Sequence, residues 1–282
     1  MKKIIALILL AVLLTTTVLL SGCGESKLTI AVPNDTTNEA RALLLLQREG
    51  FIKLKEGAGI TATIRDIVEN PLNIEFKEVA AEAIPNLLAD VDYAIINSNF
   101  AISAGINPVE KSLVMEDSSS AYANLVAVKE GHQNDPIVLA LMAALKSQKV
   151  ADFIQKTYGG AVVSVIANPT DGYDASIDYD ALNGQTLSIA ASPTPHAEIL
   201  KLAAEILKEK GITLEIREFD DYVLPNNVVE EGELNANFFQ HQPYLDDFNA
   251  QNGTHLVSVG VVHVEPMGLY GGKQSDLSAL KK

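Results

Sequence analysis

The stretch Leu28–Gly50, LTIAVPNDTTNEARALLLLQREG, predicts a strand, a polar turn and a helix in direct succession. Apolar and small side chains alternate over residues 28–32, as in a buried strand, and Pro33-Asn34-Asp35 ends that strand. The residues that follow are strong helix formers with few breaks. This order of elements indicates an α/β fold.

The beginning of the predicted helix could hold a ligand. Thr36 followed by Glu39 predicts a capping box, and Gly50 ends the helix where a left-handed residue is needed. Arg41 lies in the first turn, where its charge opposes the helix dipole, so a ligand carboxylate could pair with it. The alternative is a solvent-facing Arg41 paired with Asp35 or Glu39.

The N-terminus has the pattern of a bacterial lipoprotein signal. Lys2 and Lys3 precede an apolar run over residues 4–20, which is short for a membrane span. The run ends in Leu20-Ser21-Gly22-Cys23, a lipobox in which Cys23 would carry the lipid. We therefore expect a signal peptide over residues 1–22 and a lipid-anchored protein on the extracytoplasmic side of the cell membrane. Cys23 is the one cysteine of the chain, so no intrachain disulfide is expected.

The charge of the chain excludes one class of partner. The 282 residues carry a formal charge of −15, and loss of residues 1–22 removes two lysines and no acid. Such a surface repels nucleic acid and anionic headgroups, so we expect no nucleic-acid partner. The sequence contains no cysteine–histidine metal spacing, phosphate loop or calcium loop, and we expect no metal, cofactor or enzymatic activity.

Two further predicted strands carry polar residues of interest. Tyr93-Ala94-Ile95-Ile96 is compact and apolar and is followed by Asn97, at the strand edge where α/β proteins bind ligands. Asn124 lies inside the strand predicted over residues 123–128, an unfavourable place for an amide without a partner. A polar stretch over residues 167–185 predicts a linker or surface excursion. Helices are expected over residues 83–88, 135–145 and 150–158, and a loop with a short helix over residues 54–67.

After residue 185 the opening pattern recurs, which predicts two similar α/β lobes. Residues 187–191 read as a strand, 199–207 as a helix and 214–219 as a strand. The second half also contains aromatic residues near predicted strand ends, and these would suit a small ligand with an apolar side chain. They are Tyr222, Phe239, His241, Tyr244 and His263.

Several segments are similar to those of the NlpA-type methionine-binding lipoproteins, the substrate-binding subunits of methionine ABC importers. The segments are LTIAVPNDTTNEARALLLLQ, DIVENP, AIINSNFA, SSSAYANLVAV, HAEILKLA, FDDYVLPN, NANFFQHQPYL and VHVEPMGLY. The resemblance covers nearly all of the chain after the signal. It implies a two-lobed periplasmic-binding-protein-like fold of type 2, in which each lobe is a mixed sheet flanked by helices and the ligand lies in the interlobe cleft.

The halves stand in exchanged order relative to that family, so the chain resembles a circular permutant. In the family the half that begins with HAEIL comes first. By this mapping one lobe comprises residues 23–112 plus 269–282, the other comprises 113–268, and 167–185 joins the family's natural ends. Exposed, neighbouring termini make such a join feasible. We expect hinges near residues 111–115 and 265–270.

The resemblance also implies roles for individual residues. Arg41 would pair with the ligand carboxylate, Asn97 and Asn124 would bind the amino and carboxylate groups, and Tyr222, Phe239, His241, Tyr244 and His263 would wall the side-chain pocket. L-Methionine or a close analogue would be delivered to an ABC importer permease with its ATPase. The open alternatives are a methionine-containing dipeptide as ligand, a surface lipoprotein without a transport role, and a hydrolase, for which no nucleophile with an adjacent base stands out.

Overall fold

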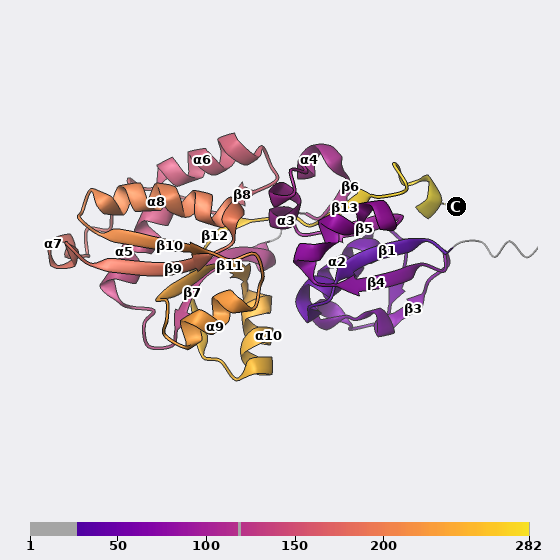
Figure 1. Cartoon of the computed structure of the whole chain (residues 1–282), viewed down its shortest axis with the longest axis horizontal. Helices are drawn as coiled ribbons and strands as arrows, with labels where there is room; N and C mark the ends of the chain where they lie inside the picture. The colour runs from indigo at the N-terminus through magenta and orange to yellow at the C-terminus, as the bar shows by residue number, and fades with distance from the viewer. Residues whose placement is uncertain (1–26, 118–119, 282) are drawn as a thin grey trace, which may run out of the picture.

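The computed structural model describes residues 27–117 and 120–281, which form two lobes around separate β-sheets (Figure 1). The predicted signal peptide, residues 1–22, and Cys23 lie outside the described residues. Within residues 27–117 and 120–281, no helix has the length and apolar character needed to cross a membrane.

The first lobe is built on a five-stranded mixed sheet in the order β4-β1-β5-β13-β6. Strands β4, β1 and β5 are parallel, whereas β13 runs antiparallel to both β5 and β6. Its strands are β1 (Thr29–Pro33), β4 (Glu75–Val79), β5 (Tyr93–Ile96), β6 (Ser112–Met115) and β13 (Gly268–Gly271). Strand β13 comes from the far end of the chain, so the first lobe needs both ends of the sequence.

The second lobe is built on a six-stranded mixed sheet in the order β10-β9-β11-β7-β12-β8. Strands β10, β9 and β11 are parallel, and β7 pairs antiparallel with β11 and β12. Its strands are β7 (Ala123–Lys129), β8 (Val163–Ser164), β9 (Thr186–Ala191), β10 (Thr213–Glu218), β11 (Ala236–His241) and β12 (Leu256–Val264). The expected architecture of two lobes, each a mixed sheet flanked by helices, is confirmed.

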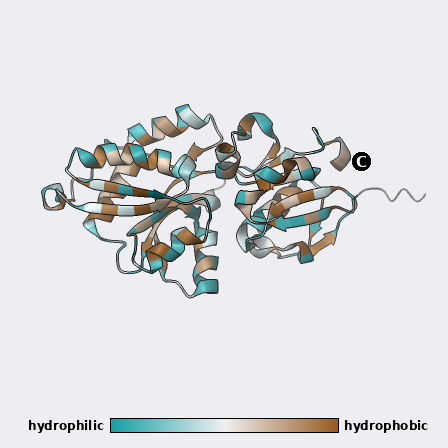
Figure 2. Cartoon of the chain, in the orientation of Figure 1, coloured by the Kyte–Doolittle hydropathy of each residue, from teal (hydrophilic) through white to brown (hydrophobic). Residues whose placement is uncertain are grey.

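Helices cover the sheets and bury apolar side chains against them. The first lobe has α2 (Thr36–Arg48), α3 (Ser98–Ser103) and α4 (Pro108–Lys111), and the second lobe has α5 (Pro136–Leu145), α6 (Gln148–Tyr158), α7 (Tyr179–Leu182), α8 (Glu198–Lys208), α9 (Leu224–Glu230) and α10 (Gln242–Asn252). Figure 2 shows hydrophobic residues on the strands and mixed faces on the helices. Each lobe has apolar clusters of its own, because each sheet packs its own helices.

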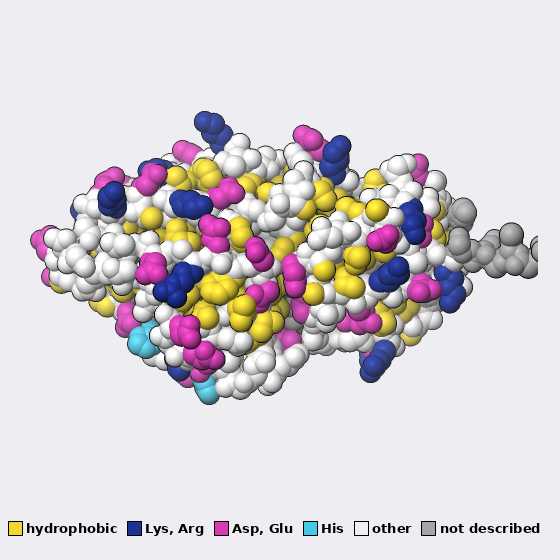
Figure 3. Space-filling view, viewed as in Figure 1, with side chains coloured by type: hydrophobic (Ala, Val, Ile, Leu, Met, Phe, Trp, Pro, Cys, Tyr) yellow, Lys and Arg dark blue, Asp and Glu magenta, His cyan; other side chains and the backbone are white. Residues whose placement is uncertain are grey.

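The exterior carries the negative charge expected from the sequence. On the face shown in Figure 3, Asp and Glu side chains are spread over both lobes, and Lys and Arg side chains are scattered among them. The formal charge of the chain is −15.

Helix α2 begins one residue earlier than the predicted capping box implies. Its N-cap is Asp35, whose Oδ1 accepts a hydrogen bond from the backbone N–H of Asn38 at 3.0 Å. Glu39 instead accepts from the backbone N–H of Ile64, 2.8 Å away, so the predicted Thr36–Glu39 capping box is wrong. An aspartate is as good an N-cap as threonine, and here it also binds the side chain of Asn38. Gly50 has a φ of +78°, as predicted.

Two segments of the first lobe differ from their predicted structure. The helix expected over residues 83–88 is a 3₁₀ segment, Ala81–Asp90, which contains Pro85; proline cannot donate the hydrogen bond that an α-helix needs there. Residues expected to form loop and short helix contain a two-stranded sheet, β2 (Lys53–Leu54) and β3 (Ile67–Glu69).

The segment 167–185 packs against the second lobe along much of its length. Thr170 forms a β-bridge with Ser147 at the start of α6. The Tyr173 hydroxyl donates to the backbone oxygen of Ile206 at 3.2 Å, and Leu182 of α7 is 5% exposed. The segment therefore contributes to the apolar core instead of serving only as a surface connection.

The chain passes between the lobes twice. One crossing lies between β6 and β7, and the other comprises residues 265–267 between β12 and β13. Strand β6 pairs with β13 in the first lobe, so the predicted boundary at residues 112–113 falls inside a strand and the crossing follows Met115. The two crossings run together, because the Glu116 backbone N–H donates to the Met267 oxygen at 2.8 Å.

Candidate functional site

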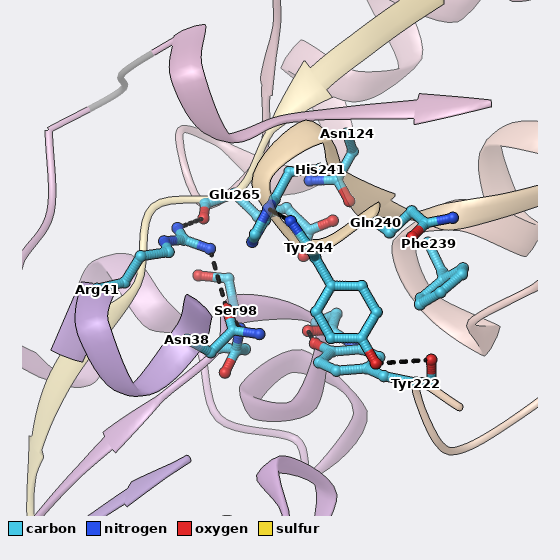
Figure 4. Close-up of a pocket in the computed structure, with 12 residues that line it drawn as sticks. Asn38, Arg41, Ser98, Asn124, Tyr222, Phe239, Gln240, His241, Tyr244 and Glu265 are labelled. Carbon is cyan, nitrogen blue, oxygen red and sulfur yellow. Dashed lines mark hydrogen bonds between the residues drawn. The ribbon is translucent and has the colours of Figure 1, made fainter. Parts of the chain in front are cut away.

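A small cavity lies between the lobes, beside the two crossings (Figure 4). Its volume is about 20 Å³, close to the space that one water molecule needs. Side chains from both lobes line it: Asn38, Arg41, Asn97, Ser98, Asn99, Asn124, Tyr222, Phe239, Gln240, His241, Tyr244 and Glu265. The lobes are thus closed onto each other, and an amino acid would need them to separate or the lining side chains to move.

Helix α2 positions the polar side of the cavity through its first two turns. The Asp35 cap binds both the backbone N–H and the side-chain amide nitrogen of Asn38, which leaves the Asn38 oxygen pointing toward the cavity. That oxygen accepts from Asn97 Nδ2 at 2.9 Å and from Arg41 Nη1 at 3.4 Å. Asn38 and Arg41 are three residues apart, so they share one face of the helix.

The guanidinium of Arg41 joins helix α2 to both crossings. It pairs with Glu116 through Nε–Oε1 and Nη2–Oε2 distances of 3.2 and 2.5 Å, and Nη2 also donates to the backbone oxygen of Glu265 at 3.2 Å. Burial alone would lower the pKa of Arg41, but the carboxylate of Glu116 outweighs it and the pKa is raised. The partner of Arg41 is therefore Glu116, and the alternative of a surface pair with Asp35 or Glu39 is wrong.

Arg41 still offers one edge to the cavity. Its Nε and Nη2 atoms are engaged by Glu116, whereas Nη1 faces Asn38 at the long distance of 3.4 Å. The ring of Tyr122 lies under the guanidinium, with its centroid 4.3 Å from Cζ. The residue is 4% exposed, so a carboxylate at the Nη1 edge would be bound away from water.

Asn97 presents an acceptor without a partner. It follows β5 at the end of the strand and is 7% exposed. Its Nδ2 donates to Asn38, and its Oδ1 is buried with no hydrogen-bond partner among residues 27–117 and 120–281. A buried acceptor of this kind is costly unless a ligand donor completes it.

Asn124 presents the opposite group. On β7, its Oδ1 lies 2.9 Å from Nε2 of His196, which therefore donates to it, and the amide nitrogen is left for the cavity. The sequence marked this amide as one that needs a partner inside a strand, and His196, 72 residues away in the chain, supplies it.

His241 is fixed as a neutral hydrogen-bond donor. It is the N-cap of α10, and its Nδ1 accepts from the backbone N–H of Tyr244 at 3.2 Å. Burial, with the charge of Arg41 as the second cause, holds the pKa of His241 well below 6.5. The single ring proton must then be on Nε2.

Aromatic rings of the second lobe form the apolar wall. Tyr222 lies 5.7 Å from Phe239 and 5.9 Å from Tyr244, measured between ring centroids. The Tyr222 hydroxyl donates to Asn99 Oδ1 in the first lobe at 2.7 Å, and the Phe100 ring is 4.8 Å from the Tyr222 ring. These contacts close the apolar side of the cavity.

The cavity gathers seven of the eight ligand residues that the sequence and the resemblance predicted. The exception is His263, which is fully buried behind the wall and does not line the cavity; its Nε2 contacts Glu265 Oε1 at 2.7 Å. The predicted set did not include five other residues that line the cavity: Asn38, Ser98, Asn99, Gln240 and Glu265. Asn38 could have been found from its spacing to Arg41, whereas Glu265 follows a strand and gives no local signal.

One group of side chains could hold a metal ion. His196, His263 and Glu265 place one nitrogen or oxygen each within 4.8 Å of the others, and all three residues are buried. Metal-bound histidines usually donate their second ring N–H to an acceptor, but Nδ1 of both histidines has no partner within the described residues. A hydrogen bond from His263 Nε2 to Glu265 and one from His196 Nε2 to Asn124 account for both Nε2 atoms without a metal.

Taken together, the cavity combines opposite polar groups on one side with an aromatic wall on the other. Donors come from Arg41, Asn124 and His241, and an acceptor comes from Asn97. This inventory suits a small molecule that carries both a carboxylate and an amino group on an apolar side chain.

Comparison with known proteins gives a consistent picture. The family model described as NlpA lipoprotein matches residues 25–166 and 187–282. Membrane lipoprotein TpN32 from Treponema pallidum is 41% identical over 135 residues, which cover 48% of this chain and 50% of that protein. The probable D-methionine-binding lipoprotein MetQ from Pasteurella multocida is 38% identical over 135 residues, 48% of this chain and 49% of that protein.

Among solved structures, a nutrient-binding protein from Burkholderia cenocepacia bound to methionine is 44% identical, with a TM-score of 0.48. The match covers 49% of this chain and 58% of that one. The chain spans about half the length of the curated relatives it matches.

Proposed function

Because the chain belongs to the NlpA lipoprotein family, we propose that it binds methionine between its two lobes as the substrate-binding subunit of an ABC importer. The observation that carries this proposal is the composition of the cavity. Polar groups of Arg41, Asn97 and Asn124 meet an aromatic wall within one buried space. The relative named for D-methionine binding supports the choice of ligand.

In the proposed complex the donors and acceptors of the cavity divide between the two ends of the amino acid. The Nη1 edge of Arg41 and the amide nitrogen of Asn124 bind the carboxylate, and Asn97 Oδ1 accepts from the amino group. His241 contributes a donor, and Tyr222, Phe239 and Tyr244 contact the thioether chain. The ligand enters when the lobes separate about the crossings at Glu116 and at residues 265–267 and is enclosed when they close.

The importer partners and the anchor are part of the same proposal. A lipid on Cys23 would hold the protein at the extracytoplasmic face of the cell membrane, and a permease with its ATPase would accept the ligand. We propose binding without turnover, so a methionyl peptide incubated with the protein should be recovered unchanged.

We also propose that the two halves stand in circularly permuted order. The family model matches the stretches on either side of residues 167–186, whereas TpN32 aligns over only half of both chains. An alignment that keeps chain order can follow only one of two exchanged halves. On this basis the lobe next to Cys23 is the one that carries Arg41 and Asn97.

Calorimetric titration tests the proposed ligand. L-Methionine and D-methionine are titrated separately into the Cys23→Ser protein lacking residues 1–22, after unfolding and refolding to remove any bound ligand. We expect tight one-to-one binding of at least one enantiomer. A folded protein that binds neither would contradict the proposal and direct attention to methionine-containing dipeptides or to a role outside transport.

A further inference from the structure

Glu265 is an acidic residue of the cavity wall to which the proposed binding mode gives no role. It lies on the second crossing, directly after β12, and is 7% exposed. Its Oε1 is held on the protein side of the wall, 2.7 Å from His263 Nε2 and 3.2 Å from His196 Nε2. No hydrogen bond to its second oxygen occurs within the described residues.

Two histidines lie beside this carboxylate, and one of them, His263, donates a hydrogen bond to it. His263 Nε2 carries the hydrogen that binds Oε1, and the Nε2 hydrogen of His196 is donated to Asn124; Nδ1 of both rings is buried without a partner in the described chain. A second proton at Nδ1 of His196 would leave an unpaired N–H inside the protein, which is costly. Burial, followed by the neighbouring His263, also holds the pKa of His196 well below 6.5.

Arg41 is close to Glu265 but does not pair with its carboxylate. The guanidinium donates a hydrogen bond to the backbone oxygen of Glu265 and forms its ion pair with Glu116. The cavity wall thus contains a buried carboxylate that lacks a cationic partner other than the two imidazoles among the described residues. Such a group favours a cation brought by the ligand.

We propose that Glu265 is the ammonium-binding residue of the site and makes it selective for ligands with a free, charged amino group. The inference rests on the proposed function, because it assumes an amino-acid ligand in this cavity. Asn97 Oδ1, on the facing lobe, accepts a second hydrogen from the same ammonium. Glu265 then binds the ammonium group of the zwitterionic ligand, and Arg41 binds its carboxylate.

The test compares two ligands in two proteins. Desaminomethionine is methionine with hydrogen in place of the amino group, so it keeps the carboxylate and the thioether. Wild type should bind methionine far more tightly than desaminomethionine. Glu265→Gln keeps the shape and a hydrogen-bond acceptor but removes the charge, and we expect it to weaken methionine binding about 10- to 100-fold and to change desaminomethionine binding little.

Two further variants separate charge from structure. Glu198→Gln removes an acid that binds the Tyr158 hydroxyl in the same lobe, outside the cavity, and should leave both affinities unchanged. Glu265→Asp keeps the charge and should retain more of the preference for methionine than Glu265→Gln. Thermal melting of each variant shows that the comparison is made between folded proteins.

Other results would overturn the inference in distinguishable ways. Equal weakening of both ligands by Glu265→Gln would assign Glu265 a structural role and leave the proposed function standing. Methionine binding that disappears with a chelator and returns with Zn²⁺ would assign the His196–His263–Glu265 group to a metal instead. Failure of wild type to bind either enantiomer of methionine would remove the proposed function itself.

Discussion

For three residues of the cavity wall, a hydrogen bond to a neighbouring group determines which polar atom faces the cavity. The nitrogen of Asn97 donates to Asn38, and the oxygen of Asn124 accepts from His196. Nδ1 of His241 accepts from a backbone N–H. Asn97 therefore offers an oxygen, Asn124 a nitrogen and His241 an N–H. Whether each group donates or accepts in the cavity therefore depends on the hydrogen bond that its other polar atom makes.

Truncation of Asn124 should strongly weaken methionine binding. Asn124→Ala removes a donor to the ligand carboxylate in a buried site, and a lost hydrogen bond to a charged group costs about 1.5–3 kcal/mol. Calorimetry should show a dissociation constant raised about 10- to 100-fold or no detectable binding. Asn134→Ala, at an exposed asparagine of the same lobe, is the matched control, and unchanged affinity in Asn124→Ala would remove Asn124 from the site.

Two buried histidines should make the protein less stable in mild acid. The pKa values of His196 and His241 are held well below 6.5, mainly by burial, so the unfolded chain binds more protons than the native one as pH falls below 6.5. Each histidine then reduces the free energy of unfolding by up to about 1.4 kcal/mol per pH unit. Urea unfolding at pH 7 and pH 5, about 2 units apart, measures the effect.

Acidic residues act in the opposite direction at lower pH. Burial is the largest influence on Asp35 and Glu39 and raises their pKa values above 3.8 and 4.5, so the native state gains protons first as pH approaches those values. The histidine effect is therefore clearest between pH 7 and 5. His196→Gln should flatten the pH dependence, whereas His255→Gln, at an exposed histidine, should not; equal slopes in all three proteins would contradict the assignment.

Sequence reasoning at the residue scale succeeded where a residue conflicts with its local surroundings. An arginine predicted in the first turn of a helix and an amide inside a strand each indicated a missing partner. Arg41, which the structure places in the second turn of α2, and Asn124 do line the cavity. The sequence around Glu265 and around His196 gives no sign that either side chain needs a partner. Their contact joins the end of β12 to the segment Pro193–Ala197 before α8, and only the folded chain brings them together.

Strands and helices with a clear apolar periodicity were predicted closely. Segments that are very short, or whose structure depends on a single residue, were not. Residues 93–96 form the expected strand, and residues 136–145 and 148–158 form the expected helices to within two residues. The 3₁₀ segment Ala81–Asp90 has an apolar pattern compatible with an α-helix, but Pro85 removes a donor. Strands β2 and β3 are too short to give a period.

The N-cap of α2 provides a test at the scale of an element. Asp35→Ala removes the acceptor for the Asn38 N–H and should lower the free energy of unfolding by about 1 kcal/mol. Asp35→Asn keeps an acceptor and should recover most of that loss. Urea unfolding at neutral pH gives both values, and equal stability of the alanine variant and wild type would show that the helix start does not depend on this cap.

At the scale of the molecule, the two lobes and their apolar cores follow from the repeated α/β pattern, but the closure of the cavity does not. It depends on contacts between residues far apart in sequence, such as Tyr222 with Asn99 and Gln251 with Thr36. The apolar periodicity of the sequence does not predict which residues form these pairs. Sequence reasoning therefore predicted the parts of the site better than its closed geometry.

Reordering the chain tests the proposed permutation. A protein that begins at residue 167, continues to 281 and then runs from 27 to 166 keeps every strand pair of both sheets. Leu28 and Leu280 contribute to the same apolar cluster, so the new join lies on one lobe. We expect the reordered protein to match the original in urea midpoint and methionine affinity; a folded product with no affinity would show that the order of the halves matters for binding.

The same topology has a consequence for cleavage in the exposed turn at residues 174–176. Strand β13, from the C-terminal piece, is inserted between β5 and β6 of the N-terminal piece, and β7 of the N-terminal piece is inserted between β11 and β12. Each fragment thus holds an interior strand of the other's sheet. The two fragments made together should associate into one folded protein despite the broken backbone, whereas either fragment made alone would have a gap in the sheet to which it contributes most strands.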